Sequence, residues 1–257
     1  RIGGMHEMLS NERHRQIISY LEQKNTVTVQ ELADILYASS STIRRDLSEL
    51  EAQGFVKRIH GGAVLTAGST FDTPARLRRT QQLAEKQRIA ELASQFLKPS
   101  STYFFDSSST ASILATRLSD YPDVKIATNG VAILSNMQST DKLSILSTGG
   151  YLRSPWDELT GNIAIKCIEN MNADVFFFSC AGFTVEQGAM ELSDDNVTVK
   201  RVFYRNSKLR ILLCDSTKIG KLLFFNSFSI SEIDYIITDR CPAYPGYVEI
   251  LGDKLIY

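Results

Sequence analysis

A short stretch near the N-terminus places hydroxyl and guanidinium side chains on one face of an expected helix. Between Ser39 and Leu50, the residues Ile43, Leu47 and Leu50 recur at i, i+4 and i+7 and form one apolar stripe. The opposite face carries Ser40, Ser41, Thr42, Arg44, Arg45 and Ser48, and Ser39 can cap the helix start. Such side chains and free helix N–H groups hold phosphates and read base edges. The pattern indicates either a nucleic-acid-reading helix or an ordinary amphipathic helix with a solvated face.

A second set of polar residues follows the expected strands of the C-terminal part. Residues Asp106, Ser107, Ser108, Ser109 and Thr110 follow one strand and run into a helix, where hydroxyl and N–H groups suit a phosphate. The other strand ends supply Thr128, Asn129, Thr148, Gly149, Gly150, Arg153, Gly182, Asp215 and Lys218. Each set alone is a generic strand-to-helix turn. Since the carboxyl ends of parallel strands share one sheet edge, together they predict a site for a small, polyhydroxylated, phosphorylated ligand.

Three helices and a hairpin are expected to position the first set of residues. A helix from Ser10 to Gln23 would bury Ile17, Ile18 and Leu21. Thr28 and Glu31 have capping-box spacing and open a second helix that would bury Val29, Leu32, Ala33 and Leu36. A tight connection at Tyr37 and Ala38 then leads to the third helix.

The hairpin completes a winged helix-turn-helix. Residues 55–59 form the expected outgoing strand, His60, Gly61 and Gly62 the turn, and residues 63–65 the return strand. The wing carries Lys57, Arg58 and His60 where a phosphate backbone would lie.

Apolar strands alternate with amphipathic helices through the remainder of the chain. The expected strands span residues 102–105, 125–127, 143–146, 175–180, 211–214 and 235–237, and the expected helices span residues 86–97, 109–118, 131–137, 158–171 and 197–206. This alternation predicts an α/β domain with a parallel sheet covered on both faces. The sequence thus divides into a DNA-binding domain at 5–66, a linker at 67–82 and an effector-binding and oligomerisation domain at 83–257.

Composition limits the alternatives only weakly. The 257 residues are 43% hydrophobic with a net charge of −1, so global charge carries no nucleic-acid signal. The four cysteines have no Cys-x-x-Cys spacing, and neither a metal nor a cofactor is expected. With no signal peptide and no long apolar run, we expect a cytoplasmic protein without membrane contact. The basic segment with Arg76, Arg78 and Arg79 either skirts DNA or forms a solvated connecting helix, and a solvated helix is the favoured interpretation.

The N-terminal motifs resemble the DNA-binding domain of DeoR-family bacterial regulators. The resemblance rests on Arg13, Ile17, the Ser39-x-x-Thr42-Ile43-Arg44-Arg45-Asp46-Leu47 string, Gly54-Phe55-Val56 and the His60-Gly61-Gly62-Ala63 wing. Within this pattern Asp46 is expected to orient an arginine rather than touch DNA.

The C-terminal motifs resemble the effector domain of the same family, which shares its fold with ribose-5-phosphate isomerase, glucosamine-6-phosphate deaminase and CoA transferases. The resemblance implies that residues 106–110 cradle the phosphate and that Lys200 and Lys218 complete the pocket. Ser108 and Ile219 depart from the Gly and Phe that the family often has there.

Three functions follow as hypotheses. The favoured one is a repressor of a sugar-utilisation operon, released by a phosphorylated sugar and acting on operator DNA as a homodimer or homotetramer. An isomerase-like enzyme fused to a DNA-binding domain is the alternative, but all three histidines (His6, His14 and His60) precede the α/β part, so a histidine relay is missing there. In the third, the α/β part only dimerises.

Overall fold

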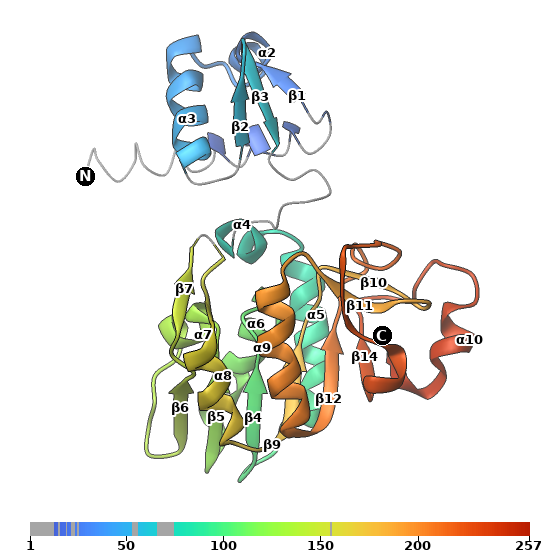
Figure 1. Cartoon of the computed structure of the whole chain (residues 1–257). Helices are drawn as coiled ribbons and strands as arrows, with labels where there is room; N and C mark the ends of the chain where they lie inside the picture. Colours follow the sequence, from blue (N-terminus) through green and yellow to red (C-terminus); the bar gives the residue numbers. More distant parts are fainter. Residues whose placement is uncertain are drawn as a thin grey trace. The chain divides into compact units, whose positions relative to one another are not determined.

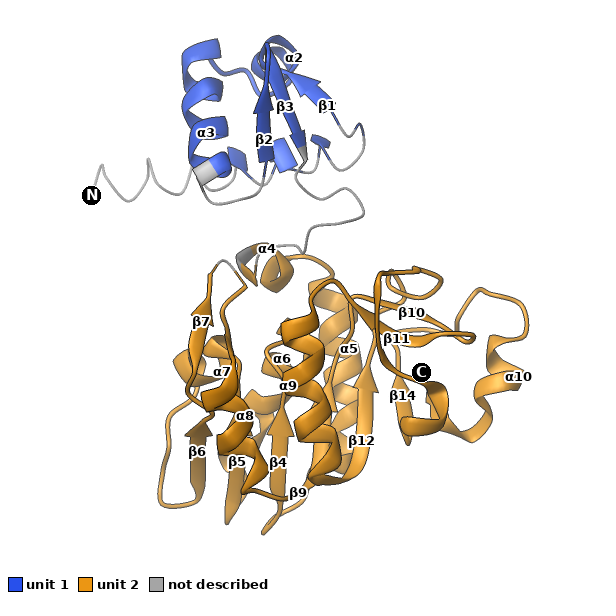
Figure 2. Ribbon diagram, viewed as in Figure 1, with its two compact units in different colours: residues 1–74 blue, residues 75–257 orange. Residues whose placement is uncertain are grey.

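The computed structural model describes residues 13–14, 16–18, 20–21, 24, 26–52, 56–65, 75–154 and 156–257. The chain folds as two compact units, Arg1–Pro74 and Ala75–Tyr257, shown in different colours in Figure 2. Each unit is described by itself.

The first unit combines helices with a three-stranded antiparallel sheet (Figure 1). Its described elements are β1 (Thr26–Thr28), α2 (Val29–Ile35), α3 (Ser40–Ala52), β2 (Val56–Ile59) and β3 (Gly62–Leu65), with the strands in the order β1-β3-β2. The described residues before β1 include helical positions from 13 to 24. The predicted winged helix-turn-helix is therefore confirmed, although Gly54 and Phe55 lie outside the described residues.

The core of this unit is most of the predicted set of apolar side chains, although Val29 and Leu36, predicted to be buried, are only half-buried. Ile17, Leu21, Leu32, Ile43 and Leu47 are all buried. The capping box is present as well: the Thr28 hydroxyl accepts from the Glu31 N–H at 3.1 Å, and Glu31 accepts from the Thr28 N–H at 2.8 Å. Strand β1 was not predicted, because its last residue, Thr28, also serves as the cap of α2.

The second unit is built on a seven-stranded parallel sheet in the order β15-β14-β12-β9-β4-β5-β6 (Figure 1). The strands are β4 (Thr102–Phe105), β5 (Val124–Thr128), β6 (Leu143–Ser147), β9 (Ala173–Phe178), β12 (Ser207–Leu213), β14 (Tyr235–Ile237) and β15 (Leu255–Ile256). The helices are α4 (Ala75–Thr80), α5 (Leu83–Ala93), α6 (Ser109–Thr116), α7 (Val131–Asn136), α8 (Asn162–Glu169), α9 (Asp194–Arg205) and α10 (Tyr247–Leu251). The predicted parallel α/β fold is confirmed.

Alternate residues of the strands feed two cores on opposite faces of the sheet. Tyr103 and Phe105 of β4 belong to the core covered by α5 and α6, whereas Phe104 belongs to the core covered by α9. This is the alternation expected for strands buried on both faces.

Several features of the second unit differ from the sequence-based prediction, which ended at the strand 235–237 and so missed α10 and β15. The helix predicted at 158–171 begins only at Asn162, because Gly161, with φ +86°, separates it from β8 (Glu158–Thr160). Strand β8 pairs with β7 (Tyr151–Arg153). A small antiparallel sheet, β10 (Gly182–Thr184), β11 (Gly188–Glu191) and β13 (Phe225–Phe228), was also missed.

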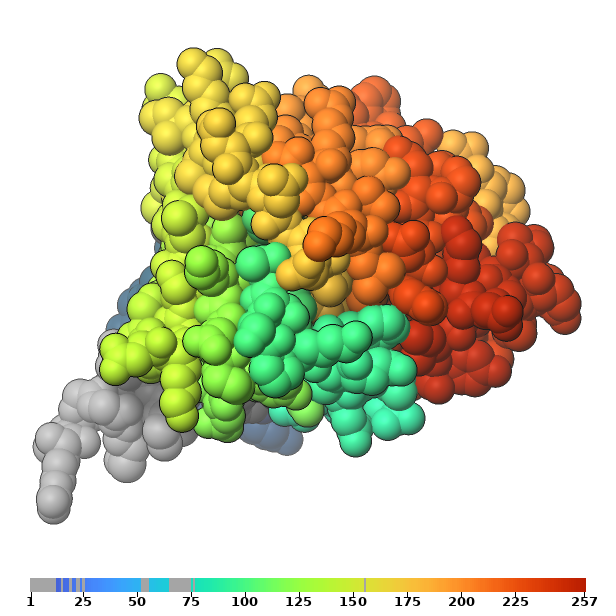
Figure 3. All heavy atoms as spheres, turned by 90° about the horizontal axis from the view of Figure 1, so that it is seen from below, coloured from blue at the N-terminus to red at the C-terminus, as the bar shows by residue number. Residues whose placement is uncertain are grey.

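Seen from below Figure 1, the second unit presents segments coloured from teal to red, from α5 to the C-terminal part (Figure 3). This is the edge at which the parallel strands begin, whereas the predicted ligand loops lie at the opposite edge. Among the described residues, no helix has the length and apolar character needed to cross a bilayer.

Candidate functional site

The predicted recognition face of α3 is well formed at its N-terminal end. The Ser39 hydroxyl accepts from the Thr42 N–H at 3.1 Å, which confirms the predicted cap, and lies 2.8 Å from the hydroxyls of Ser41 and Thr42. Arg44 and Arg45 are exposed, as is Ser41. Their hydroxyl and guanidinium groups are thus available to a polyanion.

The wing joins this face through Arg58. Its guanidinium donates to the Ser48 hydroxyl at 2.7 Å, and its backbone N–H donates to Glu51 at 2.8 Å. Lys57, His60 and Gly61 are exposed around it, and Gly61 has the positive φ of +81° that the tight turn requires. Hydrogen bonds from Arg58 therefore fix the wing against α3, the helix that carries the other predicted DNA-binding residues.

Sequence reasoning missed Tyr37 as a surface feature. This residue joins α2 to α3 with φ +49° and leaves 97% of its surface exposed. In the sequence, Tyr37 is only part of a short connection between two helices. Its exposure became evident only in the structure.

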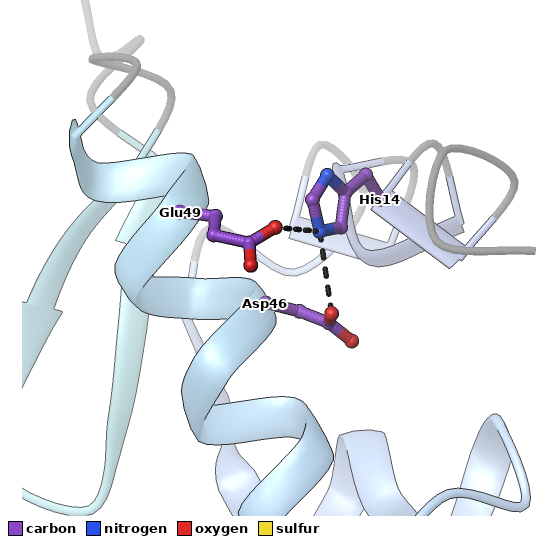
Figure 4. Close-up of side chains that lie close together, drawn as sticks. All are labelled: His14, Asp46 and Glu49. Carbon is purple, nitrogen blue, oxygen red and sulfur yellow. Dashed lines mark hydrogen bonds and ion pairs between the residues drawn. The ribbon is translucent and has the colours of Figure 1, made fainter. Parts of the chain in front are cut away.

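Behind the recognition face, Asp46 braces α3 to the preceding helical residues (Figure 4). Its carboxylate is fully buried and accepts from Arg13 Nε at 2.5 Å and Nη2 at 3.0 Å. The hydrogen bond to Asp46 raises the pKa of Arg13 above its ordinary value. The prediction that Asp46 orients an arginine is confirmed, and that arginine is Arg13.

His14 approaches the same carboxylate and is itself largely buried. Its Nε2 lies 3.3 Å from Asp46 Oδ1 and 3.6 Å from Glu49 Oε2 (Figure 4). These separations resemble those between metal ligands, but both oxygens of Asp46 already accept from the Arg13 guanidinium. A metal cation would have to sit beside that fixed positive charge, so the cluster acts as a brace.

In the second unit, the loop after β4 presents the start of α6. Ser108 caps the helix by accepting from the Ala111 N–H at 3.2 Å, while Asp106 accepts from the Ser108 N–H at 3.0 Å. Thr110 is fully buried, yet its hydroxyl has no hydrogen-bond partner among the described residues. Ser107 precedes the capping residue in the loop, and Ser109 is the first residue of the helix. The first-turn N–H groups and the Thr110 hydroxyl can receive an anion.

Lys200 of α9 is held inside an ion cluster behind this loop. Its ammonium lies 3.0 Å from Asp106, donates to the Ser179 carbonyl at 2.7 Å and bonds to Glu191. Burial lowers the pKa of Lys200, but the carboxylates of Glu191 and Asp106 outweigh it and raise that pKa above the ordinary value. Lys200 therefore anchors the loop through Asp106.

Lys218 is the more accessible cation at this edge. Its ammonium donates to the Ser179 hydroxyl at 2.9 Å and lies 3.2 Å from Asp215, and 21% of its side chain is exposed. Lys86 of α5 is a neighbouring cation that sequence reasoning missed. One lysine among the charged residues of an amphipathic helix gives no sign of a role in a site. Burial first, and then the Lys218 ammonium, lower the pKa of Lys86 to about 8.

Glu158 is the third residue that sequence reasoning missed. Its buried carboxylate accepts from Arg153 at 2.9 Å, from Ser107 at 3.2 Å and from Asn196 at 2.6 Å. It joins the loop after β4, strand β7 and helix α9. The local sequence around Glu158, three positions before Gly161, does not predict this role, because two of its three partners, Ser107 and Asn196, lie in distant segments of the chain.

Two buried amides complete the site. Asn129 donates to the Leu159 carbonyl at 3.2 Å and Asn196 donates to Glu158, and these acceptors fix which end of each amide is nitrogen. The Oδ1 atoms of both residues are buried without a hydrogen-bond partner among the described residues. Thr128 supports the turn by accepting from the Gly130 N–H at 2.9 Å.

The predicted glycines serve close backbone approaches. Gly149 and Gly150 have φ of +64° and +111°, and a Cβ at Gly150 would lie 2.4 Å from the Thr160 carbonyl oxygen. A Cβ at Gly182 would lie 2.6 Å from the Lys221 carbonyl oxygen. Thr148 lies beside them, buried, and donates its N–H to Thr128 at 3.1 Å.

Comparison with protein-family models accounts for both units. Residues 13–67 match the DeoR-like helix-turn-helix domain, and residues 81–240 match the DeoR C terminal sensor domain. The chain belongs to the DeoR family of transcriptional regulators. It is thus a DNA-binding regulator with a sensor domain, and the predicted family is confirmed.

Curated relatives of this DeoR-family regulator match along nearly its whole length. It is 35% identical to the HTH-type transcriptional regulator GolR of Listeria innocua, covering 91% of this chain and 92% of that one. It is 31% identical to the glycerol-3-phosphate regulon repressor of Escherichia coli, covering 97% and 98%. Both relatives are named as regulators of transcription.

Solved structures with similar folds are more distant from this DeoR-family regulator. Ribose 5-phosphate isomerase from Plasmodium falciparum matches with a TM-score of 0.36 and 10% identity over 53% of each chain. The eIF2B delta subunit from Chaetomium thermophilum matches with a TM-score of 0.45 and 14% identity over 65% of this chain and 59% of that one. Likenesses this distant carry no argument about function.

Proposed function

We propose that this DeoR-family protein represses a carbohydrate-utilisation operon and that a phosphorylated sugar modulates its operator binding. One observation carries the proposal: Thr110 Oγ1, Asn129 Oδ1 and Asn196 Oδ1 are buried without partners among the described residues, at one edge of the sheet. A buried unsatisfied polar group costs about 1–3 kcal/mol. Amide oxygens can only accept, so a ligand that donates several hydroxyl hydrogens satisfies them.

The phosphate of such a ligand is assigned to the start of α6. The N–H groups of its first turn and the Thr110 hydroxyl supply donors, and Lys218 supplies positive charge from the end of β12, which β9 separates from β4. Lys200 is placed behind the loop as its anchor because two carboxylates already surround its ammonium. Glu158 holds Asn196 and Ser107 in position for the sugar hydroxyls.

No enzymatic activity is included in the proposal. The α/β part has no histidine, and its buried acids are occupied: Asp106 by Lys200, Glu158 by Arg153, and Asp215 by Lys218. These carboxylates already pair with cations of the protein and are not free to contact a substrate proton. The sensor is therefore proposed to bind sugar phosphate without converting it.

We also propose that the protein acts as an even-numbered homo-oligomer. One helix-turn-helix buries too little surface for operator affinity, so two copies on a palindromic or repeated site are expected. Analytical ultracentrifugation of the intact chain should show a dimer or a tetramer, and a strict monomer both with and without DNA would contradict this.

The DNA-binding surface can be tested by comparing helix and wing variants. Arg44→Ala or Arg45→Ala is expected to weaken operator binding by about 1–3 kcal/mol through loss of a base contact. Lys57→Ala, on the wing, is expected to weaken operator and random DNA alike and to lower the salt slope by about one. Filter binding at several salt concentrations measures both. Equal losses on operator and random DNA for both arginines would show that neither reads bases.

The affinity for sugar phosphate is expected to fall as pH rises above about 8. Lys86 has a pKa of about 8 and lies close enough to Lys218 for their charges to interact. A bound phosphate raises the pKa of Lys86 toward its ordinary value, so the complex holds a proton that the free protein loses in this range. Between about pH 7 and about pH 9 we expect a drop approaching tenfold.

Calorimetry in buffers of different ionisation enthalpy measures this proton uptake directly. Lys86→Arg is the control, because a guanidinium keeps its charge and should give a flat profile over the same range. A wild-type affinity that stays constant to about pH 9 would place the phosphate away from Lys86.

The central test screens the intact protein by thermal shift against a panel of sugar phosphates and the matching free sugars. A phosphorylated member should raise the unfolding temperature and change operator affinity in the same concentration range. If the free sugars act as strongly as their phosphates, the assigned phosphate position is wrong.

A further inference from the structure

Helix α4, the first described element of the second unit, is attached to the turn between β7 and β8. Arg79 Nη2 lies 2.7 Å from the Asp157 carboxylate, and Arg78 Nη2 donates to the Trp156 carbonyl at 3.2 Å. The helix also contacts α6, and Ala75 is buried at its start. Figure 1 shows α4 beside β7, at the sheet edge where the parallel strands end. The segment expected to be a solvated linker helix is instead bound to the sensor.

The turn held by α4 leads directly into the proposed effector site. The Arg153 guanidinium lies 4.7 Å from the centre of the Trp156 ring and 2.9 Å from Glu158. The Asp157 carbonyl accepts from the Val131 N–H at 3.0 Å, next to the buried Asn129. Asn196 donates to Glu158 and Asn129 donates to the Leu159 carbonyl, and both acceptors follow the turn residues that Arg78 and Arg79 hold. A ligand that contacts either asparagine therefore acts on a residue whose hydrogen-bond partner adjoins the turn.

Lys86 makes a second connection between α4 and the site. Its ammonium donates to the Gln81 carbonyl at 2.7 Å and bonds to the Arg78 carbonyl. These carbonyls belong to the end of α4 and the residue after it, where helix carbonyls lack intrahelical partners. Helix α5, which carries Lys86, also contacts β12, the strand that precedes Lys218. The Lys218 ammonium helps to lower the pKa of Lys86, so the two charges interact.

We propose that the α4 clamp, defined as Arg78, Arg79 and Lys86 with Trp156 and Asp157, transmits effector occupancy to the DNA-binding unit. This rests on the proposed function. Through Trp156 and Asp157 the clamp joins α4 to the turn that leads into the Glu158 network. Through Lys86 it joins α4 to α5, which contacts the strand before Lys218. Ligand contacts that shift either half change how firmly α4 is held. Because α4 follows the DNA-binding unit in the chain, the change reaches the segment that connects the units.

Arg79→Ala tests the clamp without removing a proposed ligand contact. The Arg79–Asp157 pair is partly exposed, with side chains 39% and 30% exposed, so its loss should leave the fold intact. Calorimetry with each sugar phosphate of the panel should give wild-type affinity in the absence of DNA, and filter binding should give wild-type operator affinity in the absence of effector. The factor by which effector changes operator affinity should fall at least about fivefold. Arg79→Asp combined with Asp157→Arg should restore it.

Arg88→Ala is the matched control, because Arg88 forms an exposed pair with Glu91 at 3.1 Å on α5, outside the clamp. It should keep the full wild-type effector response. If Arg79→Ala also keeps that response, the clamp is not the connection. If no panel member changes the operator affinity of wild-type protein, the proposed function fails, and that result is distinct from failure of the clamp.

A second readout needs no effector. Trp156 is the single tryptophan of the chain and lies in the clamped turn, so its fluorescence reports on this place alone. By reciprocity, operator binding must disturb the turn if the turn controls operator binding. Operator DNA should change Trp156 emission in wild type and in Arg88→Ala, and change it less in Arg79→Ala. An emission unaffected by operator in wild type would overturn the proposal.

Discussion

Lys218→Ala is expected to bind sugar phosphate at least about tenfold more weakly than wild type, a loss of about 1.4 kcal/mol, while operator affinity without effector stays unchanged. Lys218 is the accessible ammonium at the proposed phosphate position, with 21% of its side chain exposed. A phosphate held by an ammonium loses a charge-assisted bond when that group is removed. The variant should behave as a repressor that sugar phosphate fails to release.

The same substitution at Lys208 provides the control. Lys208 is the second residue of β12 and bonds to Asp174 at 2.9 Å, whereas Lys218 follows the other end of that strand. Lys208→Ala should bind sugar phosphate like wild type. Calorimetry with and without operator DNA measures the sugar phosphate affinity of wild type, Lys218→Ala and Lys208→Ala. Wild-type affinity for every sugar phosphate in Lys218→Ala would show that the phosphate binds elsewhere.

Thr110→Val separates a lost ligand contact from lost stability. The Thr110 hydroxyl is buried without a partner among the described residues, so replacing it with a methyl group should not destabilise the free protein. Sugar phosphate affinity should nevertheless fall by about 1 kcal/mol, the worth of one hydrogen bond. Thr116→Val, at the far end of α6, should leave affinity unchanged. A Thr110→Val protein that loses stability would show that the hydroxyl serves the fold.

Asp46→Ala is expected to destabilise the DNA-binding unit by about 3 kcal/mol or more. Asp46 is fully buried, and its removal leaves the Arg13 guanidinium, 16% exposed, without the carboxylate that holds it. Breaking a buried ion pair by removing one partner typically costs about 3–5 kcal/mol. Operator binding should fall with the folded fraction of this unit, although Asp46 lies behind the recognition face.

The position of Trp156 lets the two units be followed separately during denaturant unfolding. Circular dichroism reports helices of both units, whereas tryptophan fluorescence reports only the second unit. Asp46→Ala should lower the denaturant midpoint seen by circular dichroism and leave the midpoint seen by tryptophan fluorescence at the wild-type value. Glu49 lies three residues after Asp46, contacts the same His14 and is 47% exposed. Glu49→Ala should therefore lower the free energy of unfolding by less than about 0.5 kcal/mol. If both variants lower the free energy of unfolding by similarly small amounts, Asp46 does not stabilise this unit in the way proposed.

Periodicity and turn chemistry in the sequence were enough to predict both folds. The stripe of Ile43, Leu47 and Leu50 fixed which face of α3 is buried, and the Thr28–Glu31 spacing predicted the start of α2. Apolar strands such as residues 102–105 predicted the parallel sheet, because only strands buried on both faces lack polar alternation. Strand ends in such a sheet meet at one edge, so the polar loops could be grouped before the structure was known.

Only the tertiary structure decided what each charged residue at that edge does. Lys200 and Lys218 look alike in sequence, yet Lys200 is enclosed by Asp106 and Glu191, while Lys218 remains partly exposed. Glu158 and the arginines of α4 gain their roles from partners many positions away. Burial and hydrogen-bond partners depend on which distant segments pack together, and local patterns report only the residues of one segment. The sequence therefore determined the main helices, most strands of the parallel sheet and the edge where their loops meet, and packing decided which groups remain for a ligand.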